Sequence, residues 1–157
     1  MKDWRYIDWT NPTDQVSDYF TVKEALWCNE WSRLATEKDG LSIMVKFNIV
    51  KAADWMDQVR EILAVPVKVK SWFRPKAYNA LIGGARESMH MDGRAVDFWT
   101  DQDGDGTRTG ADCDRIKEQL KTHLVKLDVR MEDTGKGARW VHLDDKKVPY
   151  GARFFKP

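Results

Sequence analysis

The middle of the chain shows the clearest alternation of apolar and polar positions. From about residue 48 to 63, apolar side chains recur every three or four residues, which is the spacing of one helix face. Over residues 65–70 the period changes to two, because valines there alternate with proline and lysine. A helix followed by a half-buried strand is therefore predicted. The apolar positions of the helix are Ile49, Ala53, Met56, Val59 and Leu63.

Weaker patterns on both sides predict the rest of the fold. Thr21 and Glu24 have the spacing of a capping box, which predicts a helix through about Arg33 after an irregular arm at 1–19. The turn residues of 134–137 should join two strands in a hairpin. Together the elements indicate an α+β fold with helices packed on a small antiparallel sheet. The remaining predicted elements are a helix at 76–82, a strand at 95–99, a helix at about 112–124, strands at 127–133 and 138–144, and an irregular tail at 149–157.

Composition narrows the class of protein. A chain of 157 residues fits one domain, here 1–157. The 26 Lys and Arg residues nearly balance 25 Asp and Glu residues, which argues against a nucleic-acid-binding module. No apolar run approaches the roughly 20 residues of a membrane span, so we expect no membrane partner. A monomer is expected.

The N-terminus indicates where the protein is made, and the spacing of the cysteines indicates whether they bind a metal. Residues 1–5 are followed by no apolar core, so we expect no signal peptide and synthesis in the cytoplasm. Cys28 and Cys113 form no CxxC pair, and we expect both to be small buried residues rather than metal ligands.

Three separated residues suggest a metal site. Asp97 lies in an apolar strand, where a lone charge is costly and needs a cation. His90 precedes that strand, and His142 lies in a second apolar segment. Two nitrogens, one carboxylate oxygen and an open fourth position describe a catalytic zinc site. The residues alone leave alternatives open, because a strand histidine is often a hydrogen-bonded core residue and Asp97 could pair with Arg74 or Arg94.

The segments around these residues resemble a known family. Residues 71–75 read SWFRP, residues 88–97 read SMHMDGRAVD, and residues 140–142 read WVH. In this order they resemble the zinc D-alanyl-D-alanine carboxypeptidase family, which also contains L-alanyl-D-glutamate endopeptidases, many of them phage endolysins. The resemblance covers roughly residues 20–145.

The resemblance implies a fold, a metal and roles for site residues. The fold would be the small α+β sheet shared with the amino-terminal domain of Hedgehog proteins. Zinc would bind the matching His90, Asp97 and His142. Arg74 matches a residue that binds the substrate carboxylate, which a guanidinium can grip through two parallel hydrogen bonds. Ser88 would hydrogen-bond the substrate or the metal loop, with a simple loop-capping role as the alternative.

The general base departs from the commonest family pattern. Much of the family places an acidic residue three positions before the last histidine, but this chain has Arg139 there. Part of the family uses an R-x-E segment, which Arg130–Glu132 matches, so we predict Glu132 as the base. Asp133 is the alternative, because a one-residue slip of register exchanges the two faces of a strand. Glu132 could instead only pair with Arg130 or Arg139 on a solvated face.

Asp144 is a further candidate in the predicted hairpin. It lies two residues after His142 and could accept a hydrogen bond that orients this ligand. Facing solvent is the alternative.

A second metal loop is predicted directly after the Asp97 strand. Residues 101–112 fit the register of an EF-hand calcium loop, with Gly106 at its sixth position. An acidic solvated turn is the alternative. The oxygen ligands would come from Asp101, Asp103, Asp105, Thr107, Thr109 and Asp112.

These features predict a zinc peptidase that cleaves peptidoglycan stem peptides next to D-amino acids, either as an endolysin-like endopeptidase or as a D,D-carboxypeptidase. The expected partner is the peptidoglycan stem peptide, and the expected cofactors are zinc and calcium. Without a signal peptide, the protein would reach the cell wall after release by other means, as a phage lysin does. A non-catalytic zinc- and calcium-binding module that binds the cell wall or a protein partner is the alternative.

Overall fold

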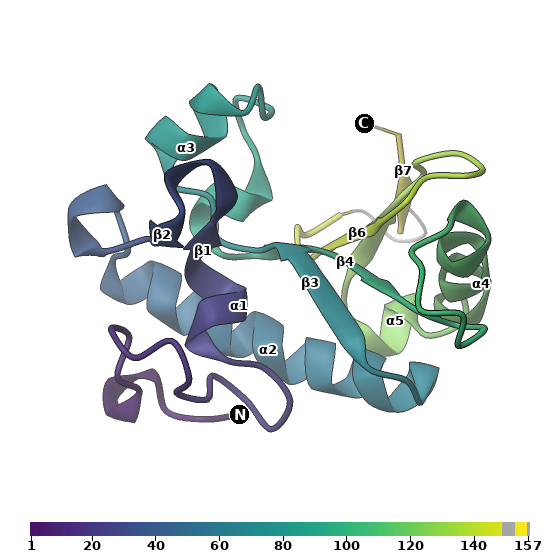
Figure 1. Ribbon diagram of the computed structural model, residues 1–157, viewed down its shortest axis with the longest axis horizontal. Coiled ribbons are helices and arrows are strands. Elements are labelled where there is room, and N and C mark those ends of the chain that lie inside the picture. The colour runs from purple at the N-terminus through teal and green to yellow at the C-terminus, as the bar shows by residue number, and fades with distance from the viewer. Residues whose placement is uncertain (149–152, 157) are drawn as a thin grey trace.

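The computed structural model describes residues 1–148 and 153–156 (Figure 1). Its order confirms the α+β class. The helices are α1 (Val22–Leu26), α2 (Ile43–Leu63), α3 (Lys76–Leu81), α4 (Gly110–Leu120) and α5 (Leu124–Leu127). The strands are β1 (Trp27–Cys28), β2 (Arg33–Leu34), β3 (Val67–Ser71), β4 (Ala95–Thr100), β5 (Arg130–Glu132), β6 (Val141–Asp144) and β7 (Phe154–Phe155). Short 3-10 turns lie at Trp4–Tyr6, Asn29–Trp31, Glu37–Asp39 and Met89–Asp92.

The main sheet has the strand order β3-β4-β6-β5-β7. Its first four strands are antiparallel, and β5 and β6 form the predicted hairpin. The prediction of an irregular tail is wrong at Phe154–Phe155, because these residues pair parallel to β5 and cover its otherwise open edge. The rest of that prediction, at 149–152 and 157, lies outside the described residues.

Helix α2 is the largest element packed against the sheet, and Figure 1 shows it running beneath the strands. All five apolar positions predicted from the helical period are buried, which confirms that face. The helix begins at Ile43, earlier than predicted, because the Ser42 side chain accepts a hydrogen bond from the Val45 amide and caps it. Ile43 and Met44 are exposed, so the first turn lacks the apolar period that marks the rest.

The N-terminal segment follows the prediction at its start only. The capping box between Thr21 and Glu24 is present. The helix ends at Leu26, however, and not near Arg33. The following residues form the hairpin β1–β2, which turns back where Ser32 adopts a left-handed conformation with φ of 51°. Pairing between these strands overrides the local helical preference.

The helix predicted at 112–124 is two helices. Thr109 caps α4 through a capping box with Asp112, so the helix begins at Gly110. It ends at Leu120, and α5 begins at Leu124 after a turn in which the His123 amide donates to the Leu120 carbonyl.

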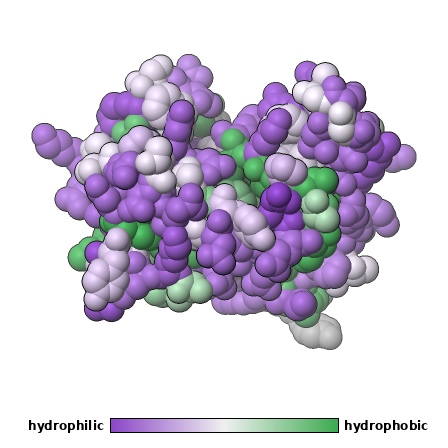
Figure 2. Space-filling model, turned by 60° about the horizontal axis from the view of Figure 1, so that its bottom comes forward, coloured by the Kyte–Doolittle hydropathy of each residue, from purple (hydrophilic) through white to green (hydrophobic). Residues whose placement is uncertain are grey.

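The surface of the protein is largely polar, as expected from a sequence without a long apolar run. The face shown in Figure 2 is mostly hydrophilic, with smaller apolar areas. No helix within the described part of the chain is long and apolar enough to cross a membrane.

Candidate metal centre

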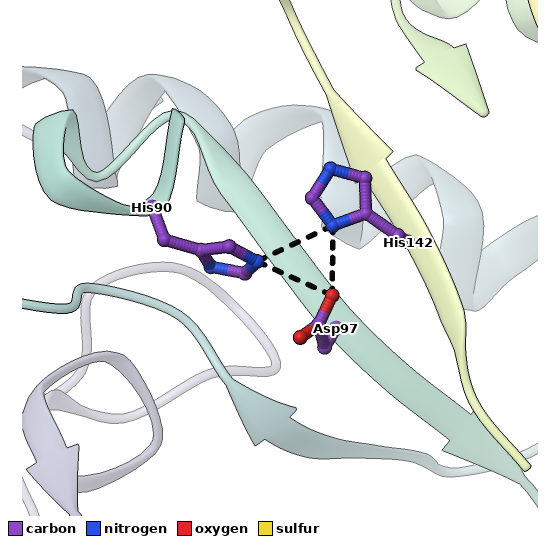
Figure 3. Close-up of side chains that lie close together, drawn as sticks. All are labelled: His90, Asp97 and His142. Atoms are coloured by element: carbon purple, nitrogen blue, oxygen red, sulfur yellow. Dashed lines mark hydrogen bonds and ion pairs between the residues drawn. The ribbon is translucent and has the colours of Figure 1, made fainter. Parts of the chain in front are cut away.

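Two neighbouring strands and one 3-10 turn bring three predicted ligands together. Asp97 of β4 is paired with His142 of β6, so both side chains leave the same face of the sheet. His90 lies in the Met89–Asp92 turn, whose position is fixed by a hydrogen bond from the Arg74 amide to the His90 carbonyl. Figure 3 shows the three side chains pointing toward one another.

The three side chains are buried and close. His142 Nδ1 lies 2.8 Å from Asp97 Oδ1, and His90 Nε2 lies 3.2 Å from the same oxygen. The two histidine nitrogens are 3.3 Å apart. The exposed fractions are 2% for His90, 3% for Asp97 and 9% for His142, so solvent does little to screen their charges.

The outer nitrogen of each ring is held by a group that can only accept a hydrogen bond. His90 Nδ1 lies 2.7 Å from the Trp72 carbonyl oxygen, and His142 Nε2 lies 3.3 Å from Asp144 Oδ2. Each outer nitrogen therefore carries a proton, which leaves His90 Nε2 and His142 Nδ1 as the nitrogens available to bind a metal. These nitrogens and Asp97 Oδ1 converge on one point, and the set suits a divalent transition metal.

The charges in this cluster favour a cation. Burial disfavours the charged form of His142, but hydrogen bonds to Asp144 and Asp97 outweigh it and raise the pKa of the imidazole to about 9. Burial lowers the pKa of His90. Burial also disfavours ionised Asp97, but the two histidines outweigh it and hold its pKa well below 3.8. The cluster thus attracts a positive charge, for which a proton and a metal ion compete at His142.

Asp144 is buried and is held by a second charge. Arg130 donates to its two carboxylate oxygens, from Nε at 2.8 Å and from Nη2 at 2.7 Å. The Arg130 guanidinium also lies over the Phe155 ring, 3.9 Å from its centroid. Burial raises the pKa of Asp144, but hydrogen bonds from His142 and Arg130 outweigh it, so the carboxylate stays ionised at neutral pH. Of the two alternatives left by the sequence, the structure therefore shows Asp144 in contact with His142.

Arg74 lies beside the cluster. Its Nη2 donates to Asp97 Oδ2, and its Nε donates to Ser71 Oγ at 2.7 Å. Of the two arginines considered as partners of Asp97, Arg94 instead pairs with Asp145. The predicted substrate-binding guanidinium is thus partly committed to the second oxygen of the candidate ligand.

The cluster opens into a cleft of about 910 Å³. Glu132 and Ser88 both line this cleft, as does Arg74. Ser88 Oγ lies 3.4 Å from the His90 amide, which fits its loop-capping alternative without excluding a contact with substrate.

The two candidate bases face different surroundings. Met131 of β5 pairs with Leu143 of β6, so in the same antiparallel register Glu132 lies beside His142, and both residues line the cleft. Asp133 follows it in the chain, is exposed and does not line the cleft. Of the two arginines considered as partners of Glu132, Arg130 pairs with Asp144, and Arg139 forms no ion pair with Glu132 among the described residues.

The acidic loop brings together only part of its predicted ligand set. The carboxylates of Asp101, Asp103 and Asp105 can approach within 4.8 Å of one another. All three already accept hydrogen bonds from loop amides. Asp112 is buried and caps α4 with Thr109, and it also accepts a hydrogen bond from the Gln102 amide. The hydroxyl of the remaining candidate, Thr107, donates to Asp105.

The cysteines take no part in either group. Both are fully buried free thiols, and burial raises the pKa of each to about 11. This confirms the expectation that Cys28 and Cys113 behave as small core residues.

Comparison with known proteins assigns the family. Neither the curated proteins nor the solved structures contain a match to the chain. A family model, described as Peptidase M15, matches residues 18–144. This span includes all three residues of the buried cluster and most of the sheet. The chain therefore belongs to the peptidase M15 family, the zinc-dependent family of the D-alanyl-D-alanine carboxypeptidase type.

Proposed function

We propose that this protein is a zinc-dependent peptidase that hydrolyses a peptidoglycan stem peptide at a bond next to a D-amino acid. The observation that carries the proposal is the convergence of His90 Nε2, His142 Nδ1 and Asp97 Oδ1 at the floor of a cleft. Two imidazoles and one carboxylate suit zinc and leave a fourth position open. Membership of the peptidase M15 family supports the same chemistry.

The chain's own residues supply the remaining functions. When bound, zinc would supply a Lewis acid and an activated water at neutral pH. We assign Glu132 as the general base, which would accept a proton from the attacking water and return it to the leaving amine. Its position beside His142 in the cleft supports this assignment over Asp133.

Substrate contacts come from the cleft wall. We assign Arg74 and Ser88 to substrate binding, because both line the cleft next to the cluster. Arg74 also fixes Asp97 through its second oxygen, so it would position a metal ligand and present its remaining N–H groups to the peptide.

The place of action is also part of the proposal. We propose that the protein is made in the cytoplasm and acts on the cell wall after release, as a monomer without a nucleic-acid or membrane partner. The near balance of 26 basic and 25 acidic residues supports the absence of a nucleic-acid partner.

The alternative is a non-catalytic metal-binding module that binds the cell wall or a protein partner. Arg139 favours it, because this residue replaces the acidic residue that much of the family carries at the matching position. Incubation of the zinc-loaded protein with purified peptidoglycan, with and without a chelator, separates the two. We expect peptide fragments that disappear with the chelator and return with added zinc, and their masses would identify the bond. Binding to peptidoglycan without fragments would favour the alternative.

A further inference from the structure

A β-bulge lies beside the metal cluster. In the pairing of β3 with β4, Val69 opposes Phe98 but Ser71 opposes Asp97, so Lys70 is the extra residue. Such bulges re-aim side chains and are common next to active sites. Here the bulge allows both Lys70 and Ser71 to line the cleft.

The Lys70 ammonium is held by an aromatic ring. It lies over Trp140, 4.3 Å from the ring centroid, and Trp140 also lines the cleft. Trp140 precedes His142 by two residues. Trp140 thus lies directly before β6, the strand that carries His142.

Lys70 is available to bind an anion. Within residues 1–148 and 153–156 it has no carboxylate within 4.0 Å. Lys70 is exposed, and desolvation together with the nearby guanidiniums of Arg74 and Arg108 lowers its pKa although Asp97 raises it. Arg74 and Arg130, by contrast, already donate to Asp97 and Asp144.

Two other cleft lysines differ from Lys70 in their position. Lys146 and Lys156 lie next in sequence to Asp145 and Phe155, on the side of the cleft away from β3. Neither has an aromatic ring beneath its ammonium among the cation–π contacts of the described chain. Among the described residues, Lys70 is therefore the cleft lysine whose ammonium rests on an aromatic ring.

We propose that Lys70 binds a carboxylate of the substrate close to the cleaved bond, and that the enzyme therefore prefers peptides in which this group is free over peptides in which it is an amide. The proposal rests on the proposed function. Lys70 directly precedes Ser71, which is paired with the candidate metal ligand Asp97, and Lys70 and Asp97 both line the cleft. The carboxylate would be the α-carboxylate of a D-glutamyl residue linked through its side chain, or the C-terminal carboxylate of a D-alanyl residue.

The same strand offers a matched control. Lys68 lies over Trp99 at 4.6 Å, in the same kind of cation–π contact, but neither residue lines the cleft. Lys68→Met removes an equivalent charge from β3 and leaves the cleft intact.

The test uses zinc-loaded protein and two pairs of synthetic stem peptides. In one pair the D-glutamyl α-carboxylate is free or amidated, and in the other the C-terminal carboxylate is free or amidated. We expect kcat/KM to favour the free acid of one pair by about ten- to hundredfold, the range of a charged hydrogen bond. Lys70→Met should abolish this preference mainly through KM, Lys70→Arg should keep most of it, and Lys68→Met should keep all of it.

The pair that shows the preference identifies the carboxylate. Equal discrimination by the original protein and Lys70→Met, or no discrimination by the original protein, overturns the proposal. If no zinc-loaded variant cleaves any peptide, the proposed function fails separately. Calorimetric binding of the same peptides then decides the role of Lys70, with preferential binding of a free acid that is lost in Lys70→Met as the expected result.

Discussion

The buried aspartate inside β4 and the three aspartates of the loop that follows this strand differ in almost every physical respect. Asp97, inside β4, is buried and is contacted by side chains from distant parts of the chain, namely His90, His142 and Arg74. The acidic loop after β4 is largely exposed, and its carboxylates accept hydrogen bonds from its own amides. The buried cluster therefore offers a metal ligand atoms that separate elements hold in place. The carboxylates of the loop are instead open to water and already hydrogen-bonded to the loop's own backbone.

This difference in surroundings has an energetic consequence. A buried charge costs several kcal/mol unless it is compensated, while an exposed one costs little. The cluster therefore has more to gain from a cation than the loop, although the loop holds more carboxylates. The number of acidic residues in a sequence segment is a poorer guide to a metal site than the burial and convergence of a few.

The largest expected effect is the loss of zinc from the buried cluster. His90→Ala removes one of three ligands. We expect bound zinc to fall from about one equivalent to near zero, because the two remaining ligands cannot hold the ion. Elemental analysis of the purified protein measures this. Asp103→Asn is the control from the loop and should retain zinc. A His90→Ala variant with undiminished zinc would place the metal elsewhere.

The second effect separates catalysis from metal binding. Glu132→Gln should keep zinc and the fold but lower kcat by on the order of a hundredfold or more, because the amide cannot accept the proton. Asp133→Asn, on the opposite face of the hairpin, should leave kcat unchanged. The reverse result would assign the base to Asp133, and unchanged kcat in both variants would indicate a water relay or another group.

The sequence predicted most of the sheet and α2 because periodic patterns are local. Ile49 and Leu63 repeat with the helical period, and the valines of β3 alternate, so each pattern could be read without knowing its partner. The hairpin β1–β2 and the parallel strand β7 were missed because they depend on pairing with a neighbour. No local pattern in Phe154–Phe155 distinguishes an edge strand from a tail.

The candidate site, too, could be predicted from the sequence only where local residue types carry a signal. The ligand types at His90, Asp97 and His142 carried a sequence signal, and their convergence follows from the register of β4 and β6. The Trp72 carbonyl that fixes the His90 ring is a backbone atom, so it leaves no sequence signal. Lys70 was missed because its place in the cleft depends on a bulge.

The third effect concerns the carboxylate that orients His142. Asp144→Asn replaces a pure acceptor with an amide that can present either an oxygen or an NH₂ group to Nε2, and we expect zinc affinity to fall about ten- to hundredfold. Competition with a chromogenic chelator measures it. Asp145→Asn is the matched control, because Asp145 is equally buried but pairs with Arg94 and Lys51. Equal losses in both variants would show a general loss of stability rather than an effect on His142.

The same variant should change the pH dependence of the zinc-free protein. The pKa of His142 rises from 6.5 to about 9 in the folded state, so its contribution to stability is fully present below pH 6.5 and is lost as pH rises toward 9. Asp144→Asn removes one of the carboxylates that raise this pKa. Thermal melts in chelator should therefore lose less stability between pH 6.5 and 9 in this variant than in the original protein.

The smallest effect is expected from calcium at the acidic loop. Asp101, Asp103 and Asp105 lie close enough to share an ion, and a divalent cation would relieve their mutual repulsion. The Asp112 carboxylate at the end of the loop is held in the cap of α4, so an ion would have to displace existing hydrogen bonds.

Binding at this loop should therefore be weak. A calcium ion that binds this loop would stabilise the folded state by about 2.7 kcal/mol at a hundredfold excess over the dissociation constant, but by only about 0.4 kcal/mol when the two concentrations are equal. We expect a small rise in the melting midpoint of the zinc-loaded protein at millimolar calcium. The double variant Asp103→Asn/Asp105→Asn should remove that rise while keeping its zinc, because these carboxylates do not contact the cluster. An unchanged midpoint in the original protein would identify the loop as a solvated acidic turn, and a rise as large as that produced by zinc would contradict the comparison between buried and exposed carboxylates.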